Sequence, residues 1–524
     1  MGLLRAVVLG SCVGVCCFFS CGTPVSSDDG GSGGGSTATG GSGGGAMTGG
    51  GAGGGAATGG GAAGGGAAGG GGAVGGGAGD DAGVDAGFDA GVVDAGPPPD
   101  VSLPAQPCVD SASAVTAAAG TPSQALGERL ACHFERSLTA NEVAMKTPSA
   151  PAAASPVDLF LISYRTTRRG QVPGAGTARV YLPKQPAAGP LPAVVVVHGS
   201  VGVADSCAPS AETEGLFSMA MPWVSRGYAV IAPDLAGLGN ATVQGYVDNH
   251  DTAMSTLDAV RALRSFVRPR AIDGRAILVG FSQGGGAVLA AQSLEGAYGS
   301  GGRIASVVAV APQFFTRLNS FGFVNMLRMP DALTVAQGYT KPVVAALRTY
   351  AWYENTLGAG HGVEAFPADG GAGTVAALES RCLIDLGAWL PSNRTHVRDL
   401  MDDTLRTTFL ACVDGPFSSG CVPPGKTLYD GLSGDTLHGD PTGAPVLYLQ
   451  GSLDTVMPIG EEAACNVPAM RNAGVPLTFC TDGLALHSNI YDRNVELVRT
   501  WAEATALGLP APSCTVGTPP ACPP

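Results

Sequence analysis

The sequence predicts an α/β protein whose core is a mostly parallel sheet with helices on both faces and a helical cap insertion. Two observations support this prediction. Short apolar runs alternate with segments of helical periodicity from about residue 157 to residue 505, as in parallel sheets whose strands are joined by helices. One of these transitions, at residues 276–292, reads AILVGFSQGGGAVLAAQ, with a Gly-x-Ser-x-Gly turn between the apolar run and the helical pattern.

The elements before this turn follow in order. Val157–Tyr164 and Ala178–Leu182 alternate between apolar and polar residues, which predicts antiparallel strands that open the sheet. Leu191–Val197 is a continuous apolar run, typical of a strand buried on both faces. The next strand is predicted at Tyr228–Ile231. Helices are expected at residues 212–226 and 252–267.

The alternation stops after one further strand, predicted at Ile304–Val310. Residues 312–441 are irregular and helix-like. Because this interruption follows a sheet strand, and strand ends are where such proteins contact substrate, we interpret it as a cap over the active-site edge. An independent accessory domain is the alternative. The remaining elements are strands at Pro445–Leu449 and Val475–Phe479 and a helix at residues 489–505.

The N-terminal part of the chain has a different composition. Residues 1–21 consist of a short basic start, an apolar run of about 15 residues and Cys21, a length that suits a signal peptide and is too short for a membrane span. Residues 22–100 are mostly Gly, Ala, Ser and Thr. Such a segment buries too little apolar surface to offset its ordering entropy, so we predict a disordered tether before a globular domain at residues 101–524.

The start of the chain resembles a bacterial lipoprotein, in which Cys21 would become the lipidated first residue. Leu9-Gly10-Ser11-Cys12 fits the lipoprotein pattern more closely but leaves almost no apolar segment before it. We therefore predict an exported protein, anchored by lipid at Cys21 to a bacterial outer membrane. Plain secretion is the alternative.

The cysteines agree with export. Four of the 14 cysteines lie in residues 1–21, which leaves ten in the globular domain. An even number in an exported chain predicts disulfides. Short spacings favour four pairs and leave the fifth by default: Cys108–Cys132, Cys412–Cys421, Cys465–Cys480 and Cys514–Cys522, then Cys207–Cys382.

Charge and motif chemistry exclude several classes of function. The net charge of −14 argues against nucleic-acid binding. The segment at residues 420–427 matches the phosphate-binding loop pattern, but its two prolines remove backbone N–H donors and no strand precedes it. The cysteines show no Cys-x-x-Cys spacing. We therefore predict no nucleotide, no metal and no organic cofactor.

The Gly-x-Ser-x-Gly turn places Ser282 between a strand and a helix, where a serine acts as a nucleophile if a base and an acid accompany it. In this arrangement the acid precedes the histidine. Asp454 directly follows a predicted strand, and His487 is the only one of the seven histidines beyond it. Asp435 and Asp440 are rival acids without a clear strand before them. The sequence thus predicts a Ser282–His487–Asp454 triad.

The oxyanion of the reaction is expected to bind backbone N–H groups. One is that of Gln283, which follows the serine. The other comes from the loop that starts at His198, where we select Ser200, with Val201 as the near alternative. His198 is expected to support this loop, and Asp234 to fix a loop rather than to take part in catalysis.

Together these residues resemble the α/β-hydrolase superfamily. Pro233–Gly239, Leu257–Ala262 and Gly280–Gly285 are, more narrowly, similar to the secretory lipase family of fungi and actinobacteria. The resemblance covers about residues 155–505. It implies an α/β-hydrolase domain within residues 101–524, hydrolysis of carboxylic esters including acylglycerols under a helical lid, and no metal or organic cofactor.

The sequence therefore predicts a serine hydrolase, an esterase or lipase, that forms an acyl-enzyme on Ser282. Its partners would be a small-molecule or lipid ester and, only through the anchor at Cys21, a membrane. A peptidase or a dienelactone-type hydrolase could use the same triad, because fold does not determine the acyl substrate. A non-catalytic surface binding protein is the remaining alternative, and the intact set of Ser282, Asp454 and His487 argues against it.

Overall fold

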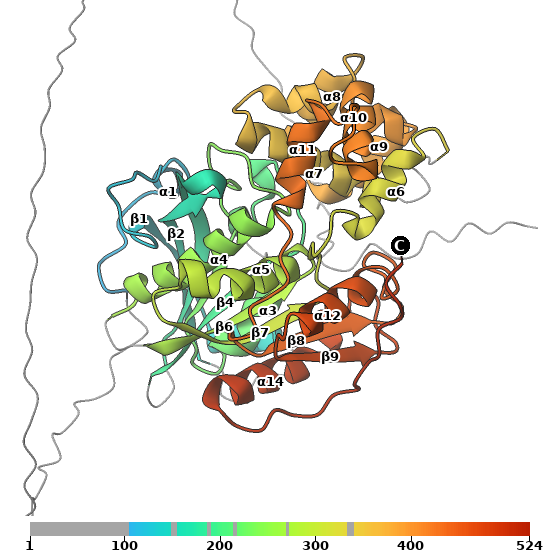
Figure 1. Ribbon diagram of the computed structural model, residues 1–524. Coiled ribbons are helices and arrows are strands. Elements are labelled where there is room, and N and C mark those ends of the chain that lie inside the picture. The colour runs from blue at the N-terminus through green and yellow to red at the C-terminus, as the bar shows by residue number, and fades with distance from the viewer. Residues whose placement is uncertain are drawn as a thin grey trace, which may run out of the picture. The chain divides into compact units, whose positions relative to one another are not determined.

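The computed structural model describes residues 104–147, 155–185, 190–212, 217–268, 272–332 and 340–523 (Figure 1). The predicted signal peptide at residues 1–21 and the predicted tether at residues 22–100 lie outside these ranges, and both stay predictions. The described residues form one α/β body with a group of helices on one side of it, and each part is considered below.

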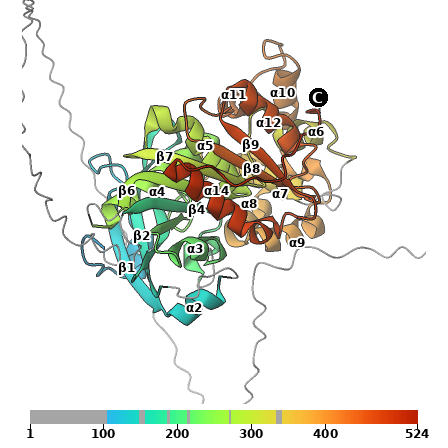
Figure 2. The same ribbon diagram turned by 90° about the horizontal axis from the view of Figure 1, so that it is seen from below.

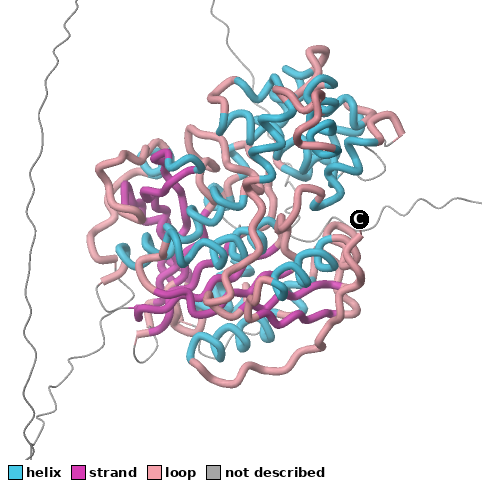
Figure 3. The backbone as a smooth tube through the Cα atoms, viewed as in Figure 1, coloured by secondary structure: helices cyan, strands magenta, loops and turns pink. Residues whose placement is uncertain are grey.

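The core is a nine-stranded sheet in the order β1-β2-β3-β5-β4-β6-β7-β8-β9. Its strands are drawn in magenta in Figure 3. The pairs β1–β2, β2–β3 and β3–β5 are antiparallel, and all pairs from β5 to β9 are parallel. The predicted mostly parallel sheet is confirmed. The strands are β1 (Arg129–Leu138), β2 (Val157–Arg168), β3 (Val172–Pro183), β4 (Leu191–Val197), β5 (Val230–Pro233), β6 (Ile272–Phe281), β7 (Arg303–Val310), β8 (Val446–Gly451) and β9 (Leu477–Asp482).

Helices cover both faces of this sheet. Val195 and Val197 of β4 pack in one apolar cluster with residues of α4, α5 and α12, whereas Val194 and Val196 pack in another with residues of α3 and α14. Figure 2 shows α3 and α14 in front of the sheet. Because both faces are buried, the central strands are continuously apolar rather than alternating. The helices of the body are α1 (Ala112–Thr116), α2 (Ala140–Met145), α3 (Phe217–Val224), α4 (Asn249–Phe266), α5 (Gln283–Tyr298), α12 (Glu462–Asn472), α13 (Ile490–Arg493) and α14 (Val495–Leu507).

The predicted helical insertion is present between β7 and β8 (Figure 1). Its helices share an apolar cluster of their own, which also takes in residues from loops of the body, among them Val203, Tyr246, Phe315 and Met457. The insertion is therefore packed onto the loops at the carboxyl edge of the sheet. We call it the cap. Its helices are α6 (Phe323–Arg328), α7 (Thr340–Thr356), α8 (Gly371–Ser380), α9 (Leu383–Asn393), α10 (Asp403–Asp414) and α11 (Gly425–Ser433).

Sequence reasoning missed the first strand, β1, which pairs antiparallel with β2. Its sequence RLACHFERSL has little hydrophobic periodicity, and its burial is mixed. β1 is an edge strand, and charged side chains are common on such strands because part of their surface is exposed. None of the helices in the described part of the chain is long and apolar enough to cross a membrane.

The structure confirms three predicted disulfides and corrects two. Cys108–Cys132, Cys412–Cys421 and Cys207–Cys382 are formed as predicted. The predicted pairs Cys465–Cys480 and Cys514–Cys522 are wrong, and the observed pairs are Cys465–Cys522 and Cys480–Cys514.

Cys465 and Cys480 are close in sequence, but they do not pair because the sheet lies between them. Cys480 of β9 belongs to the apolar cluster on the face covered by α14, whereas α12, which carries Cys465, packs on the opposite face. After α14 the C-terminal tail returns along β9, where the N–H of Thr481 donates to the carbonyl of Thr515 (2.9 Å). This path brings Cys514 to Cys480 and Cys522 to Cys465.

Candidate active site

Ser282 lies on a tight turn between β6 and α5. Its φ of 53° and ψ of −116° are unusual for a residue with a side chain. Three backbone hydrogen bonds fix this conformation: the N–H of Ser282 donates to the carbonyl of Val310 (2.9 Å), and its own carbonyl accepts from the N–H groups of Gln313 (2.9 Å) and Gly286 (3.1 Å). Strained backbone held in this way is typical of functional sites, and here it holds the serine at the end of the strand.

The glycines around the serine are required by the close approach of backbones. A Cβ atom on Gly280 would lie 2.0 Å from the carbonyl oxygen of Gly284, and a Cβ on Gly284 would lie 2.1 Å from the carbonyl oxygen of Val197. Neither backbone oxygen can yield without moving its element, α5 for Gly284 and the central strand β4 for Val197. The sequence pattern Gly-x-Ser-x-Gly thus has a steric basis in this structure.

We expect Gly284→Ala to lower the free energy of unfolding by about 1–3 kcal/mol or more, because the added methyl group overpacks the site where α5 meets β4. The measurement is urea unfolding of the purified variant. The control is Gly274→Ala on β6, where an added Cβ meets no atom within 4 Å among the described residues. Equal stability of the two variants would contradict this account of the turn.

The structure brings Ser282, His487 and Asp454 together. His487, in the loop between β9 and α13, lies with Nε2 3.0 Å from Oγ of Ser282 and with Nδ1 2.8 Å from Oδ2 of Asp454. The side chain of Asp454 is fully buried, and that of His487 is 15% exposed. Its ring also rests against the ring of Phe281 at 4.9 Å between centroids. A histidine so placed can exchange a proton with the serine while the carboxylate fixes its orientation.

Asp454 is held by four hydrogen bonds. Its Oδ1 accepts from the backbone N–H groups of Val456 (2.9 Å) and Met457 (2.7 Å), and its Oδ2 accepts from His487 and from Nε2 of Gln450 (3.2 Å). Nε2 of Gln450 also donates to the carbonyl of Met457 (2.7 Å), so both of its hydrogens are used. Sequence reasoning missed Gln450. Its place at the end of a buried strand, four residues before the acid, was the available signal.

The two rival acids have other roles. Asp435 accepts hydrogen bonds from the backbone N–H groups of Asn249 (2.9 Å) and His250 (3.1 Å), and Asp440 accepts one from Thr442 (2.8 Å). Asp440 thus caps a local turn, whereas Asp435 binds the start of α4. Nδ1 of His487 faces Asp454 instead.

The loop after β4 lies directly beside the serine. A Cβ on Gly199 would stand 3.3 Å from Cβ of Ser282. His198 bridges this loop to the next one, with Nδ1 2.6 Å from the carbonyl oxygen of Gly199 and Nε2 2.9 Å from that of Asp234. The hydroxyl of Tyr246 donates to Oγ of Ser200 (2.8 Å). The loop expected to carry an oxyanion donor is therefore fixed next to Ser282.

Gln283 supplies the other expected donor. It is the first residue of α5, and the N–H groups of a helix's first turn have no partner within the helix. An anion beside Ser282 would also face the positive end of the helix dipole. The geometry is thus suited to a negatively charged oxygen at this position.

Asp234 is a buried carboxylate that organises loops. It accepts hydrogen bonds from the N–H of Ser210 (2.8 Å), the hydroxyl of Ser210 (2.5 Å) and the hydroxyl of Thr177 (2.7 Å). Burial raises its pKa, which these hydrogen bonds oppose. The partners of this carboxylate among the described residues do not include Ser282, His487 or Asp454, as expected for a loop-fixing residue.

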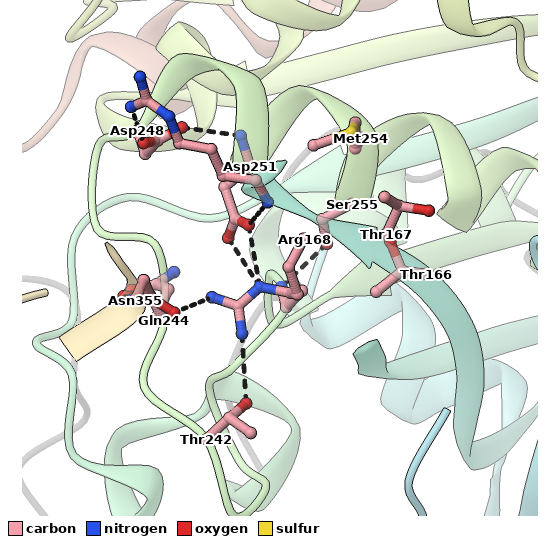
Figure 4. A network of polar contacts seen from close by, with 12 residues as sticks. Thr166, Thr167, Arg168, Thr242, Gln244, Asp248, Asp251, Met254, Ser255 and Asn355 are labelled. Atoms are coloured by element: carbon pink, nitrogen blue, oxygen red, sulfur yellow. Dashed lines mark hydrogen bonds and ion pairs between the residues drawn. The ribbon is translucent and has the colours of Figure 1, made fainter. Parts of the chain in front are cut away.

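A disulfide and a group of side-chain hydrogen bonds are among the connections that fix the cap to the body. On one side the Cys207–Cys382 disulfide joins the loop after β4 to the start of α9, and the N–H of Leu383 donates to the carbonyl of Val201 (2.8 Å). On the other side Arg168, at the end of β2, donates to Asp251 of α4 (2.9 Å) and to Asn355 of α7 (2.8 Å), as Figure 4 shows. The cap is thus tied directly to the predicted oxyanion loop.

One group of side chains has the residue types of a cation site. Asp248, His250 and Asp435 each offer a ligand atom, and these atoms lie within 4.8 Å of one another. The guanidinium of Arg169 already lies among them, 2.5 Å from Asp248 and 3.6 Å from Asp435. Because this cation pairs with both carboxylates, the group is better described as an ion-pair network than as a metal centre.

We expect this network to make stability depend on pH. The hydrogen bond that Nδ1 of His250 donates to Asp435 raises the pKa of His250 above its ordinary value of 6.5, and partial burial opposes this shift. Asp248 and Arg169 also face the ring. A raised pKa in the folded state contributes stability below the unfolded pKa, and this contribution is lost as pH rises through the folded value. The stability difference between wild type and His250→Gln should therefore shrink from about pH 5.5 to about pH 8.5 in urea unfolding.

The control for this prediction is His361→Gln. His361 pairs with Glu364, and both side chains are about half exposed. Solvent screens such pairs, so this variant should show little pH-dependent difference. A difference for His250→Gln that does not change with pH would refute the prediction.

Comparison with known proteins is consistent with this geometry. A family model described as the alpha/beta hydrolase fold matches residues 192–467. The closed state of Candida antarctica lipase A is similar in structure, with a TM-score of 0.57 and 17% identity over 80% of this chain and 90% of that one. The rice cell wall degrading esterase LipA from Xanthomonas oryzae gives a TM-score of 0.52 and 18% identity over 73% of this chain and 97% of that one.

A hydrolase from Legionella pneumophila described as putative is also similar, with a TM-score of 0.55 and 15% identity over 71% of this chain and 97% of that one. No curated protein sequence matches the chain. At these identities the solved structures show a shared fold, while the family model covers more than half of the 524 residues. The sheet order, the turn at Ser282 and this match lead to one conclusion: the chain belongs to the α/β-hydrolase fold family.

Proposed function

We propose that this protein is a serine hydrolase that cleaves carboxylic esters. The observation that carries the proposal is the continuous hydrogen-bonded series from Oγ of Ser282 through His487 to Asp454, with distances of 3.0 and 2.8 Å. Such a series is the arrangement that activates a serine for attack on an acyl carbon.

The reaction would proceed in two halves. Nε2 of His487 takes the proton of the Ser282 hydroxyl as Oγ attacks the ester carbonyl, and the resulting imidazolium then gives that proton to the departing alcohol. This leaves an acyl group on Ser282. Water, deprotonated by the same histidine, attacks the acyl carbon and releases the acid. Asp454 holds the tautomer of His487 and stabilises its charged form in both halves.

The negative oxygen formed in each half would be bound by the N–H of Gln283 and by an N–H of the loop after β4. We retain Ser200 as the second donor, with Val201 as its alternative. Support comes from the position of Gln283 at the start of α5 and from Gly199 lying beside Ser282. Donors held in place before the reaction need no reorganisation as the charge develops.

The substrate we propose is an ester with an apolar acyl group. Loop residues close in sequence to the predicted catalytic group, such as Val203 and Met457, belong to the apolar cluster of the cap, so the surroundings of this group are apolar and suit an apolar acyl chain. Two of the similar solved structures are described as a lipase and an esterase. We propose the same general activity for this chain.

We also propose that the protein is exported and held at the cell surface through a lipid on Cys21, with residues 22–100 as a tether. The five disulfides support export, since such bonds persist in oxidising compartments. Labelling of cells with a lipid precursor tests the anchor: incorporation into the wild type and its loss in Cys21→Ala are expected.

The activity is tested by hydrolysis of p-nitrophenyl esters whose acyl chains run from two to sixteen carbons. Serine-dependent turnover is expected, and the preferred chain length distinguishes an esterase from a lipase. Peptide and lactone substrates are tested in parallel. Turnover of peptides alone would replace the proposal with a peptidase, and no turnover by folded, oxidised protein would favour a binding role.

A further inference from the structure

The hydroxyl of Ser200, in the loop after β4, has a hydrogen that no protein group accepts. Its Oγ accepts a hydrogen bond from the hydroxyl of Tyr246 at 2.8 Å. Among the described residues, no group accepts the hydrogen of the Ser200 hydroxyl itself. Ser200 is partly exposed, so a bound molecule can reach it. This hydrogen is therefore available to a substrate.

Tyr246 is the donor of this pair for two reasons. A phenol is more acidic than an aliphatic alcohol, so in a bond between the two hydroxyls the tyrosine donates and the serine accepts. Tyr246 is also 1% exposed and packs in the apolar cluster of the cap. Burial raises the pKa of Tyr246, and the hydrogen bond to Ser200 opposes this shift. The phenol therefore keeps its proton and directs it at Oγ of Ser200, whose own hydrogen must point elsewhere.

The backbone on both sides of Ser200 is held in place. The preceding residue, Gly199, is so close to the catalytic turn that a Cβ on it would lie 3.3 Å from Cβ of Ser282. On the other side, the carbonyl of Val201 accepts from the N–H of Leu383 in the cap (2.8 Å). Ser200 is thus fixed directly after the residue that lies against Ser282.

A serine in this position can offer two donors to one atom. Its N–H and its hydroxyl are separated by only three bonds, so a single oxygen can accept from both. A hydroxyl that itself accepts a hydrogen bond is a stronger donor, because hydrogen bonds in series polarise one another. A donor that is oriented before the reaction suits an oxygen that becomes negative only as the reaction proceeds.

We propose that the hydroxyl of Ser200 is a further oxyanion donor and that Tyr246 positions it. This inference rests on the proposed function. As Oγ of Ser282 attacks the ester, the negative oxygen would accept from this hydroxyl in addition to the backbone N–H groups of Gln283 and of the loop after β4. Ser200 is then a catalytic residue through its side chain, and Tyr246 is a positioning residue that acts through Ser200.

The first test is steady-state hydrolysis of a p-nitrophenyl ester by the full chain with Ser200→Ala, which keeps the backbone N–H and removes the hydroxyl. We expect kcat to fall by about 10²-fold, the loss typical of one oxyanion donor, with little change in KM. A trifluoromethyl ketone with the same acyl chain forms an adduct on Ser282 that carries the same charged oxygen, so its inhibition constant should rise in parallel. Ser200→Thr, which keeps a hydroxyl, should retain most of the activity.

A double variant separates catalysis from packing. Ser200→Ala leaves the buried hydroxyl of Tyr246 without an acceptor, which should lower the melting temperature, and adding Tyr246→Phe should restore it. Tyr246→Phe alone should lower kcat by about fivefold to tenfold. In the Ser200→Ala background the same change should have no further effect on kcat, because Tyr246 acts only through the Ser200 hydroxyl.

The matched control is Tyr350→Phe. Tyr350 is a buried tyrosine of the cap whose hydroxyl also donates to a side chain, that of Glu379 at 2.6 Å. Loss of this bond removes a buried phenol hydroxyl away from Ser200, so the variant should keep the kcat of the wild type.

Two results would overturn the proposal: a wild-type kcat in Ser200→Ala, or a kcat that recovers together with the melting temperature in the double variant. In either case the two hydroxyls would only hold the loop. If Ser200→Ala does not fold, the double variant decides, since it leaves no unpaired hydroxyl. A wild-type protein without turnover that depends on Ser282 would instead contradict the proposed function, and this inference with it.

Discussion

Ser282→Ala is expected to lower kcat for ester hydrolysis by about 10⁵-fold, to a level set by binding and oxyanion donors alone. The substitution removes the atom that we propose attacks the ester. It leaves the turn intact, since the three hydrogen bonds that fix Ser282 use only its backbone. Binding of substrate should change little. The measurement is steady-state hydrolysis of a p-nitrophenyl ester by wild type and variant at equal concentration.

The control for this prediction is Ser293→Ala. Ser293 lies on α5, and its hydroxyl donates to the carbonyl of Leu289 (2.9 Å), one turn away on the same helix. We expect this variant to retain wild-type kcat. Substantial turnover by Ser282→Ala, in a preparation free of wild-type protein, would show that another group performs the attack.

Asp454→Asn has the second largest expected effect, a loss of about 10⁴-fold in kcat. The backbone N–H groups of Val456 and Met457 both donate to Oδ1, so the amide oxygen of Asn must take that position. Its NH₂ group then faces Nδ1 of His487. That nitrogen would have to accept, which moves the proton to Nε2. A histidine protonated at Nε2 cannot take the proton of Ser282.

The matched control is Asp440→Asn, which changes a rival acid that caps a local turn at Thr442. This variant should keep nearly all activity. The two variants are compared by kcat and by circular dichroism, which confirms that both are folded. A small loss for Asp454→Asn together with a large one for Asp440→Asn would reassign the acid.

Much of the proposed site can be predicted from sequence because each member has a local signal. Ser282 lies in a glycine pattern whose steric basis is a contact between backbones. Asp454 and His487 lie in loops that follow parallel strands, and all such loops emerge at one edge of the sheet. The order of Ser282, Asp454 and His487 in the chain and their positions after strands are therefore enough to select residues that lie within hydrogen-bond distance of one another.

Features that depend on distant packing could not be predicted in this way. The amide of Gln450 is oriented by its two acceptors, Asp454 and the carbonyl of Met457. In the sequence Gln450 is only one residue of a strand, and the two acceptors cannot be seen there. The pairing of Cys465 and Cys480 depends on which face of the sheet each side chain meets. Proximity in sequence says nothing about that, so local spacing gave the wrong partners.

The attachment of the cap bears on how a substrate enters. The disulfide at Cys207 and the contacts of Arg168 are two of the connections that hold the cap. A lid that swings away as a rigid unit would have to break both. Movement of individual helices or loops between these points is the smaller change, so entry through a local opening is more consistent with this structure.

The C-terminal tail has a consequence for how the protein behaves among its neighbours. β9 is the last strand of the sheet, and its outer side is covered by the tail, through backbone hydrogen bonds at Phe479 and Thr481 and the bond between Cys480 and Cys514. An uncovered edge strand can recruit strands of other molecules and start aggregation. The tail fills that position covalently, so crowded copies of this protein are protected from polymerising through this edge for as long as the bond is intact.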